Sequence, residues 1–409
     1  MMDSLKNHIS KISKGATPAN VMNSREHESD VLFLKSGNVG EGSLVLKELS
    51  YISKKDHELL SRSSLKNNDV LLSIAGGIGK VAVIKNLNEQ ANTNQANAFI
   101  RTLPSLRPEY LSIAFQSSLL KEQFAKETVE SAIQNLSMGQ IQNVKLNVPS
   151  IERQDKVIES ISKKFLLLNN FINSLTQKLH HIEEYKTALI HNAVTKGLDA
   201  NNCRILDGTP AEDMKWKDSG IEWIGDIPDG WKLIKLKDYF NVTMGETILK
   251  EDLSDESFGI PVYSATKEDV VFGYVNNASK LLNPGDIVIA ARGNSIGNPN
   301  IISALSTSTQ TTIQLNKKRK VNSEFIKYWM LGSHDEIFKF DNTAIPQFTV
   351  DDSKNIVSVM PGSDETLRIC NYLSKKLEVL KVSKETINKK IALLLEYKKS
   401  LINEAVSGQ

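Results

Sequence analysis

Cysteine, histidine and aromatic residues are scarce in this 409-residue sequence, which holds 2 cysteines, 7 histidines and 6% aromatic residues. Two cysteines, Cys203 and Cys370, fit a reducing compartment and cannot form a structural zinc site alone. The histidines do not compensate, because the adjacent pair His180 and His181 would point in different directions on a helix. A disulfide scaffold and a zinc-stabilised fold are therefore excluded.

Long apolar runs are also missing. A transmembrane helix needs about 20 consecutive apolar residues, and no stretch of the sequence approaches that length. The first residues, Met-Met-Asp-Ser-Leu-Lys, lack the apolar core of a signal peptide. We therefore expect a cytoplasmic protein without membrane contact. The hydrophobic content of 40% is ordinary for a globular protein, and the length suffices for two or three domains.

The sequence carries no strong charge excess of either sign, since its net charge is +2. Residues 1–150 hold 17 Lys and Arg against 14 Asp and Glu, whereas residues 201–360 hold 17 against 22. Nucleic-acid-binding domains often show a basic excess. Net charge alone therefore does not indicate DNA, although a local basic face can lie within a neutral total.

Catalytic signatures are absent as well. Gly76–Lys80 resembles a phosphate-binding loop, but Ala75 stands at the required glycine and Val81 at the required Ser or Thr. A tight turn between strands explains these glycines better. The motifs of dinucleotide-binding, serine hydrolase, zinc protease and amino-methyltransferase sites do not occur. We expect a chain that is not an enzyme and binds no metal or cofactor of its own.

The sequence does contain an internal duplication. At a constant offset of 212, residues 162–164 (Ser-Lys-Lys) match 374–376, and residues 184–186 (Glu-Tyr-Lys) match 396–398. The register holds without gaps over about 65 residues. Further upstream the repeat is looser, with Gly15-Ala16-Thr17 parallel to Gly245-Glu246-Thr247. The chain is therefore two copies of one unit, each a globular domain followed by a helix.

Each helix carries apolar residues at alternating spacings of 3 and 4, the seam of a coiled coil. In the first helix the seam comprises Ile158, Ile161, Phe165, Leu168, Ile172, Leu175, Leu179, Ile182 and Leu189. In the second it comprises Leu373, Leu377, Leu380, Ile387, Ile391, Leu394 and Leu401. Lys186 and Lys398 share one seam position, where a polar residue can fix the register. The short connection favours an antiparallel pair, but a parallel pair is sterically possible, and plain oligomerisation helices are the alternative.

The globular domains mix apolar strand-like runs with short helices, which indicates an α/β or α+β fold with a β-rich core. The expected strands are Val70–Ile74, Val81–Ile84, Ile287–Ala291 and Thr311–Leu315, and the expected helices are Pro108–Leu119 and Ser323–Met330. We divide the chain into domain 1 (1–149), helix 1 (150–198), a loop-like linker and lead-in segment (199–232), domain 2 (233–360) and helix 2 (361–409).

The lead-in segment identifies a family resemblance. Asp218–Lys232, with the sequence DSGIEWIGDIPDGWK, resembles the start of a target recognition domain in the specificity (S) subunits of Type I restriction–modification systems. Gly15-Ala16-Thr17-Pro18, Asp286-Ile287-Val288 and the Glu-Tyr-Lys of each helix are similar to the same family, and the resemblance covers the whole chain. The first copy departs from the pattern because it begins near Leu5 without this lead-in, so we expect its N-terminus to pack differently.

The resemblance implies a function. Each target recognition domain would read one half of a bipartite double-stranded DNA target, and the paired helices would set the spacer between the halves. Two methyltransferase (M) subunits would dock on the chain and bring S-adenosylmethionine, while restriction (R) subunits would bring ATP and magnesium. Half-sites one turn of DNA apart, roughly 34 Å, need a rigid spacer of that order.

Candidate DNA contacts follow from residue type. In domain 2, Arg292 and Asn294 suit guanine and adenine edges, and the run Lys317, Lys318, Arg319 and Lys320 suits phosphates unless it is a solvated turn. In domain 1 the comparable candidates are Lys14, Arg62, Lys80, Asn94 and Gln95. The loops ahead of the helices offer Gln134, Asn135 and Gln347 with either a binding or a structural role.

Two other functions fit parts of the sequence. A coiled-coil adaptor with two protein-binding ends would explain the helices and domains without DNA. A self-contained nuclease would need a metal-binding carboxylate cluster, which we do not find. Salt-dependent DNA affinity separates the first alternative from a specificity subunit, and magnesium-dependent cleavage by the isolated chain would support the second.

Overall fold

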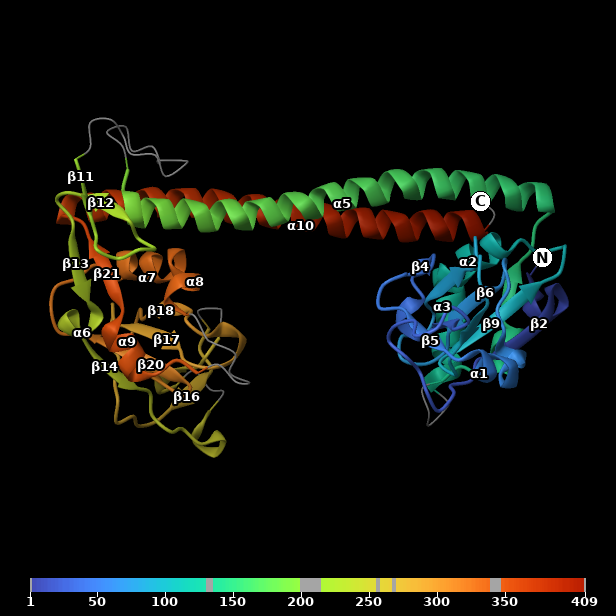
Figure 1. The fold of residues 1–409 in the computed structure, drawn as a ribbon, viewed down its shortest axis with the longest axis horizontal. Helices are drawn as coiled ribbons and strands as arrows, with labels where there is room; N and C mark the ends of the chain where they lie inside the picture. Colours follow the sequence, from blue (N-terminus) through green and yellow to red (C-terminus); the bar gives the residue numbers. More distant parts are fainter. Residues whose placement is uncertain are drawn as a thin grey trace. The chain divides into compact units, whose positions relative to one another are not determined.

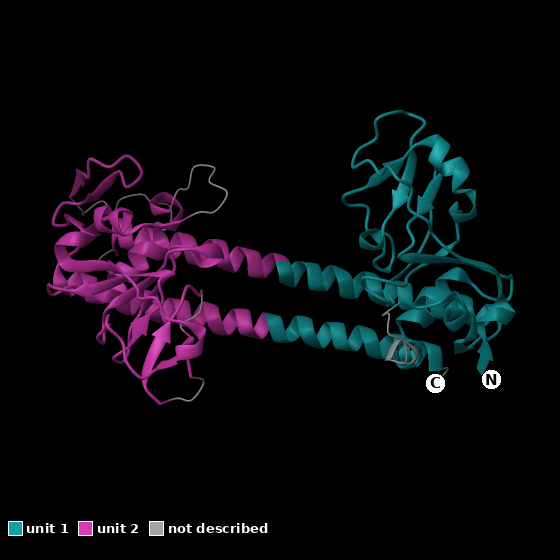
Figure 2. Ribbon diagram, turned by 90° about the horizontal axis from the view of Figure 1, so that it is seen from below, with its two compact units in different colours: residues 1–176, 388–409 teal, residues 177–387 magenta. Residues whose placement is uncertain are grey.

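The computed structural model describes residues 2–129, 135–198, 215–254, 258–266, 270–338 and 347–407. The chain forms two compact units (Figure 2). Unit 1 comprises residues 1–176 and 388–409, and unit 2 comprises residues 177–387. Each unit holds one β-rich domain with short helices and a segment of each of the two long helices (Figure 1). Cys203 lies outside the described residues.

Unit 1 is built on two sheets and a strand pair. The larger sheet has the order β2 (Ile9–Lys14), β9 (Asn97–Thr102), β6 (Val70–Ser73), β7 (Val81–Val83) and β4 (Glu41–Gly42). The smaller has the order β5 (Ser50–Ile52), β3 (Val31–Leu34) and β8 (Ala91–Thr93), and β1 (Met2–Ser4) pairs with β10 (Lys145–Asn147). The helices are α1 (Lys54–Leu59), α2 (Pro108–Gln116), α3 (Ser118–Val129) and α4 (Met138–Asn143), with short 3-10 turns at Leu5–His8, Ser36–Asn38 and Ser61–Ser63.

The larger sheet is buried on both faces, which explains its continuous apolar strands. Successive side chains of a strand point to opposite faces. Val70 and Leu72 accordingly join the core beneath α2, whereas Leu71 packs with Phe99 toward the smaller sheet. Strand-like runs without alternation are therefore typical of this fold, and the strands expected from Val70 and from Val81 are confirmed.

Unit 2 repeats this architecture. Its four-stranded sheet has the order β14 (Phe240–Met244), β20 (Thr312–Lys317), β17 (Ile287–Ala290) and β18 (Pro299–Ile301). Its three-stranded sheet has the order β16 (Gly273–Val275), β15 (Ile260–Tyr263) and β19 (Thr307–Ser308), and β13 (Lys232–Lys235) pairs with β21 (Val357–Met360). The helices are α6 (Leu236–Tyr239), α7 (Ser323–Gly332), α8 (His334–Ile337) and α9 (Val350–Asn355), with 3-10 turns at Lys250–Asp252 and Gly293–Ser295.

The duplication extends to single hydrogen bonds. In each small sheet the middle strand pairs antiparallel with one neighbour and parallel with the other. Helices α4 and α9 begin with the same capping box at the 212 offset, formed by Ser137 with Gln140 and by Thr349 with Asp352. The two-copy architecture predicted from the sequence is confirmed.

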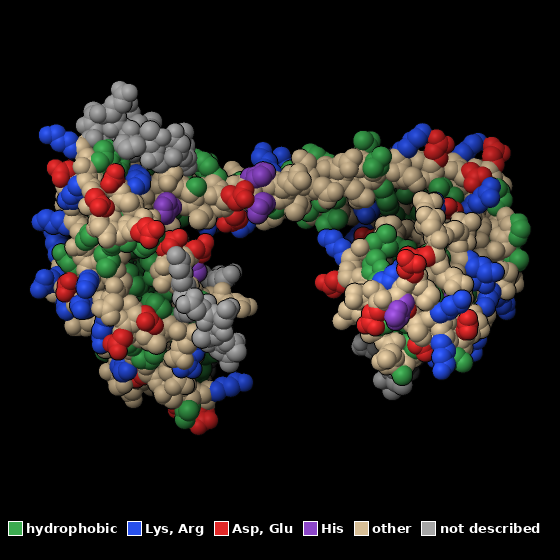
Figure 3. Space-filling model, in the orientation of Figure 1, with side chains coloured by type: hydrophobic (Ala, Val, Ile, Leu, Met, Phe, Trp, Pro, Cys, Tyr) green, Lys and Arg blue, Asp and Glu red, His purple; other side chains and the backbone are tan. Residues whose placement is uncertain are grey.

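The long helices are α5 (Ile151–Lys196) and α10 (Ser363–Ser407). All predicted seam residues are buried or half-buried. The deepest recur every two heptads at equivalent positions, and they are Ile161, Leu175 and Leu189 in α5 and Leu373, Ile387 and Leu401 in α10. Large apolar side chains also remain exposed on the outer faces of both helices (Figure 3).

Within each unit the two helix segments run antiparallel. In unit 1 the Lys398 ammonium lies 4.9 Å from the centre of the Phe165 ring and 3.5 Å from Asn169 Oδ1, and Leu401 packs near Ile161. In unit 2 Lys384 Nζ donates to Glu183 Oε1 at 2.6 Å. Residues early in α5 therefore lie against residues late in α10, as the short connection predicted.

Two expectations about the segments that lead into the domains were wrong. The linker and lead-in segment is not all loop, because β11 (Trp216–Asp218) and β12 (Asp226–Pro228) form a hairpin. This hairpin is held to the end of α5, where Lys196 Nζ donates to the carbonyl oxygens of Ile224 and Asp226 at 3.0 and 2.6 Å. Residues 199–214 of the linker lie outside the described residues.

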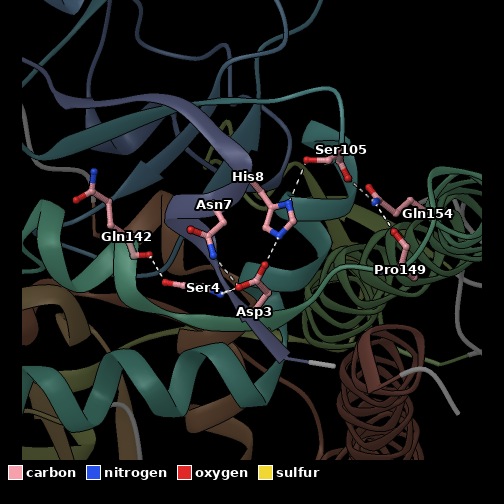
Figure 4. A network of polar contacts seen from close by, with 8 residues as sticks. All are labelled: Asp3, Ser4, Asn7, His8, Ser105, Gln142, Pro149 and Gln154. Atoms are coloured by element: carbon pink, nitrogen blue, oxygen red, sulfur yellow. Dashed lines mark hydrogen bonds and ion pairs between the residues drawn. The ribbon is translucent and has the colours of Figure 1, made fainter.

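The N-terminus of unit 1 does not pack differently from its counterpart. Strand β1 pairs with β10 as β13 pairs with β21, and Leu5 N donates to Val144 O as Leu236 N donates to Ile356 O. A polar network that includes Asp3, His8 and Ser105 fixes this end to the domain (Figure 4). The domain topology at this end is therefore the same in both units.

Candidate functional site

A loop-to-loop contact, here called the clasp, joins the two sheets of unit 1. After β2 the chain passes so close to the β8–β9 loop that a Cβ on Gly15 would lie 2.1 Å from Thr93 O and 2.2 Å from Asn94 O. Gly15 N donates to Asn97 O at 3.0 Å. Only glycine fits this approach, so the backbone dictates Gly15.

The clasp of unit 1 ends in a side-chain contact at the surface. The Thr17 hydroxyl donates to the carboxamide oxygen of Gln95, and both side chains are exposed. A glutamine whose oxygen already accepts a hydrogen bond still offers its amide N–H groups as donors. The clasp therefore holds a donor group at a fixed place on the surface.

Unit 2 contains the same clasp. A Cβ on Gly245 would lie 2.2 Å from Thr309 O and 2.6 Å from Ser308 O. The Thr247 hydroxyl donates to Gln310 Oε1 at 3.1 Å, and Gln310 is exposed. Gln310 is thus the structural counterpart of Gln95.

Sequence reasoning singled out Gln95 and missed Gln310. The signal was available, because the parallel between Gly15–Thr17 and Gly245–Thr247 implies a partner loop in each copy. That loop reads Thr-Asn-Gln at residues 93–95 and Ser-Thr-Gln at residues 308–310. The two loops share only the glutamine, so their correspondence depends on the strands that flank them.

The clasp of unit 1 borders a hollow with a volume of about 970 Å³. Three predicted DNA contacts, Lys14, Arg62 and Gln95, line it together, and Asn135 and Gln140 add further amides. None of the described residues that line it carries a carboxylate. The structure thus brings most of the domain 1 candidates to one positively charged, hydrogen-bonding surface that is suited to an anionic ligand.

Two domain 1 candidates lie outside this hollow. Lys80 is exposed beside the Gly-rich turn between β6 and β7. Asn94 belongs to the clasp through its backbone, and its Oδ1 is buried without a hydrogen-bond partner among the described residues. Gln134 lies outside the described residues.

In unit 2 the turn between β17 and β18 supplies the corresponding surface. Arg292 and Asn294 are exposed there, and the backbone of Arg292 bridges to Gln347. Phe348 N donates to Ala291 O in unit 2 as Leu136 N donates to Ile74 O in unit 1. Arg292 therefore stands in the place of Ala75, and Gln347 in the place of Asn135.

The basic run lies elsewhere in unit 2. Lys317 ends β20, whose first residue Thr312 is next to the clasp, so Lys317 lies about 17 Å from the clasp along the strand. Lys317 N donates to Asp286 Oδ1 at 2.8 Å, and the amides of Lys318 and Arg319 donate to Tyr239 O. The structure does not bring Lys317, Lys318, Arg319 and Lys320 together with Arg292, and their backbone contacts are those of a turn ahead of α7.

A carboxylate distinguishes the clasp of unit 2. Glu246, in the place of Ala16, accepts hydrogen bonds from Thr307 Oγ1 at 2.6 Å and from Ser279 Oγ at 2.5 Å. Burial raises the pKa of Glu246, but these hydrogen bonds lower it by more than burial raises it, so the pKa lies below its ordinary value of 4.5. Glu246 is therefore ionised at neutral pH, which makes the unit 2 surface less positive than that of unit 1.

Other kinds of site are not apparent in the described part of the chain. It contains no group of three or more His, Cys, Asp or Glu side chains that could hold a metal ion. No helix within it is both long and apolar enough to span a bilayer.

Comparisons with known proteins agree with this geometry. The sequence model of the family described as Type I restriction modification DNA specificity domain matches residues 8–184 and 228–391. The chain is 24% identical over 166 residues to the Type I restriction enzyme EcoBI specificity subunit of Escherichia coli. This match spans 40% of this chain and 34% of that subunit. It is 24% identical over 434 residues to the MjaVIII specificity subunit of Methanocaldococcus jannaschii, across 98% of this chain and 90% of that subunit.

Solved structures share the fold. A chain from a study of complex assembly and conformational transition of the type I R-M system aligns with a TM-score of 0.72, at 13% identity and over 97% of both chains. The HsdS subunit from Thermoanaerobacter tengcongensis aligns with a TM-score of 0.54, at 14% identity, over 100% of this chain and 96% of that one.

Proposed function

Since this chain belongs to the Type I restriction modification DNA specificity family, we propose that it selects the DNA target of a Type I restriction–modification complex. Each domain reads one half of a bipartite sequence in double-stranded DNA. The chain performs no chemistry itself. Methylation, with S-adenosylmethionine, belongs to two methyltransferase subunits, and ATP- and magnesium-dependent restriction belongs to restriction subunits where the system has them.

The repeated clasp carries this proposal. Both domains hold the same Thr–Gln pair on the same backbone frame, while the residues around it differ between Ala75 and Arg292 and between Asn135 and Gln347. A shared frame with different hydrogen-bonding groups is what two readers of different half-sites require, because base edges are distinguished by their donor and acceptor patterns.

The outer faces of the helices support partner docking. Leu167 and Val379 are equivalent in the repeat and are 69% and 62% exposed, and the equivalent Tyr185 and Tyr397 are 42% and 52% exposed. Exposed apolar side chains that gather in a patch mark interaction surfaces, and Leu166 and Phe171 are exposed beside Leu167. The occurrence of exposed apolar side chains at equivalent positions fits two copies of one partner, which we assign to the methyltransferase subunits.

The proposal is tested by co-expressing the chain with its methyltransferase subunit in a host without adenine methylation. Long-read sequencing of the host DNA should reveal one bipartite methylated motif that is absent when the chain is omitted. Replacing residues 233–360 with the second domain of a relative should change one half of that motif and leave the other intact. Methylation without a shared motif, or a motif that does not depend on the chain, would contradict the assignment.

A further inference from the structure

We propose that Gln95 and Gln310 contact the DNA backbone at equivalent points of the two half-sites, and that Thr17 and Thr247 are positioning residues that orient them. This inference rests on the proposed DNA-binding function, which it deepens. It assigns to the two glutamines a contact that is independent of base sequence, and it leaves base reading to the residues around them.

The geometry favours the role of hydrogen-bond donor for each glutamine. Its oxygen accepts the threonine hydroxyl, as the contacts from Thr17 to Gln95 and from Thr247 to Gln310 show. No described residue accepts a hydrogen bond from the Nε2 of Gln95 or Gln310. The exposed end of the clasp is therefore a pair of N–H donors, which matches the acceptor oxygens of a phosphate group.

The clasp also orients this donor in advance. Ala16 N donates to Thr93 O at 3.1 Å and Glu246 N donates to Ser308 O at 2.9 Å, so the threonine-bearing loop is anchored in both units. Fixing a glutamine side chain on binding costs conformational entropy. The threonine contact reduces that cost because the side chain is already held in the free protein.

The repeat separates backbone contacts from base contacts. An identical group on an identical frame does not by itself distinguish two different half-sites, which favours a contact with what every sequence shares, the sugar–phosphate backbone. In unit 1 the hollow beside Gln95 adds the cations Lys14 and Arg62, as expected for a surface that follows phosphates. Arg292 in the place of Ala75 is the type of difference that reads bases.

The test replaces each glutamine with glutamate, as Gln95→Glu and Gln310→Glu. Glutamate keeps an oxygen that accepts the threonine hydroxyl, so the clasp stands, but it exchanges the amide donor for a negative charge facing phosphate. Dissociation constants of the full chain are measured by fluorescence anisotropy on a duplex with the methylated motif and on an unrelated duplex. We expect each variant to bind both duplexes about 10-fold more weakly, and the double variant about 100-fold more weakly, since distant sites act additively.

Lysine substitutions, which add positive charge, show whether weaker binding by the glutamate variants is due to charge or to misfolding. Gln95→Lys and Gln310→Lys should strengthen binding to both duplexes and steepen its salt dependence by about one phosphate contact. Thr17→Ser and Thr247→Ser keep the hydroxyl and should bind within twofold of the natural chain. The methylated motif should stay the same in all of these variants, whereas Arg292→Ala should relax it at one half.

The outcomes separate the inference from the function on which it rests. Glutamate variants that bind like the natural chain, or that change the methylated motif, would overturn the backbone assignment and leave the DNA-binding function standing. A natural chain that binds neither duplex would overturn the function itself.

Discussion

Gln154 should stabilise unit 1 far more than the equivalent Thr366 stabilises unit 2. The Gln154 side chain is 0% exposed in the first turn of α5. Its Nε2 donates to Ser105 O at 2.9 Å and to Pro149 O at 2.8 Å, and its Oε1 accepts from Arg107 N at 2.8 Å (Figure 4 shows the two carbonyl contacts). One side chain therefore ties the start of α5 to the loop that leads into α2.

Gln154→Leu keeps the side-chain volume and removes all three hydrogen bonds. Each partly buried backbone group left without a partner costs about 1 kcal/mol, so the expected loss of unfolding free energy is about 2–3 kcal/mol after a small gain from burying leucine. At the equivalent position the Thr366 hydroxyl donates to Gly362 O at 2.9 Å, a local contact with the residue just ahead of α10. Thr366→Val should therefore cost less than about 1 kcal/mol.

Hydrogen exchange measured by mass spectrometry is the suitable assay, because two compact units need not unfold together. Peptides that cover residues 105–116 and 145–160 should exchange about 30- to 150-fold faster in Gln154→Leu, as 1.4 kcal/mol corresponds to a factor of ten. Peptides of unit 2 should not change. If Gln154→Leu and Thr366→Val alter exchange equally, the three hydrogen bonds contribute no more than a single helical contact, and the reasoning is wrong.

Three further predictions address chemistry, pH and geometry. In a Cys203→Ser background, the Cys370 thiol, whose pKa burial raises to about 12, should react with a disulfide reagent at pH 8 only when unit 2 unfolds. Hydrogen bonds from Ser4 N and neighbouring side chains lower the pKa of Asp3 below 3.8. Their contribution is therefore present above pH 3.8 and lost as the pH falls through the lowered value, and Asp3→Asn should remove this acid dependence from unit 1 exchange. Inserting one heptad after residue 176 and another after residue 387 lengthens both helices by about 10.5 Å. It should widen the spacer of the methylated motif by roughly 3 base pairs without changing either half, whereas altered bases would contradict the proposed role of the helices.

The helices were the most predictable part of the fold. Their apolar seam repeats every 3 or 4 residues apart from a few lysines, and the periodicity alone places Ile161, Leu175 and Leu189 on one face, where the structure buries them. Local sequence suffices there because an amphipathic helix needs only a partner surface along its length. The domain boundaries drawn from the sequence stay predictions.

The segments that lead into the two domains were less predictable because their structure depends on long-range contacts. Strands β11 and β12 have three residues each, in a segment whose glycines and prolines indicate a loop. They pair where Ile227 and Trp231 pack against the end of α5. Strand β1 likewise depends on β10, more than 140 residues away in sequence.

The candidate site was predictable by residue type but not by place. Lys14, Arg62 and Gln95 are distant in sequence, and only the sheet order brings them to one hollow. The run Lys317–Lys320 is the more conspicuous signal, yet it follows the far end of β20. A charge run does not indicate which end of a sheet it will occupy. A motif that occurs in both copies, such as Gly15–Thr17, does, because its glycine is required by a specific close backbone contact.

The positions of the cations around the clasp bear on the symmetry of the target. In unit 1 a cation, Lys14, directly precedes the clasp glycine, and the turn after β6 carries the uncharged Ala75. In unit 2 a cation also lies at the clasp, because Lys280 Nζ donates to Met244 O at 2.7 Å, and the turn after β17 carries a second cation, Arg292. If both glutamines contact the backbone at equivalent points, Arg292 adds a charged donor in unit 2 where unit 1 has the uncharged Ala75. We therefore expect two different half-sites, since a palindromic target mirrors identical protein halves.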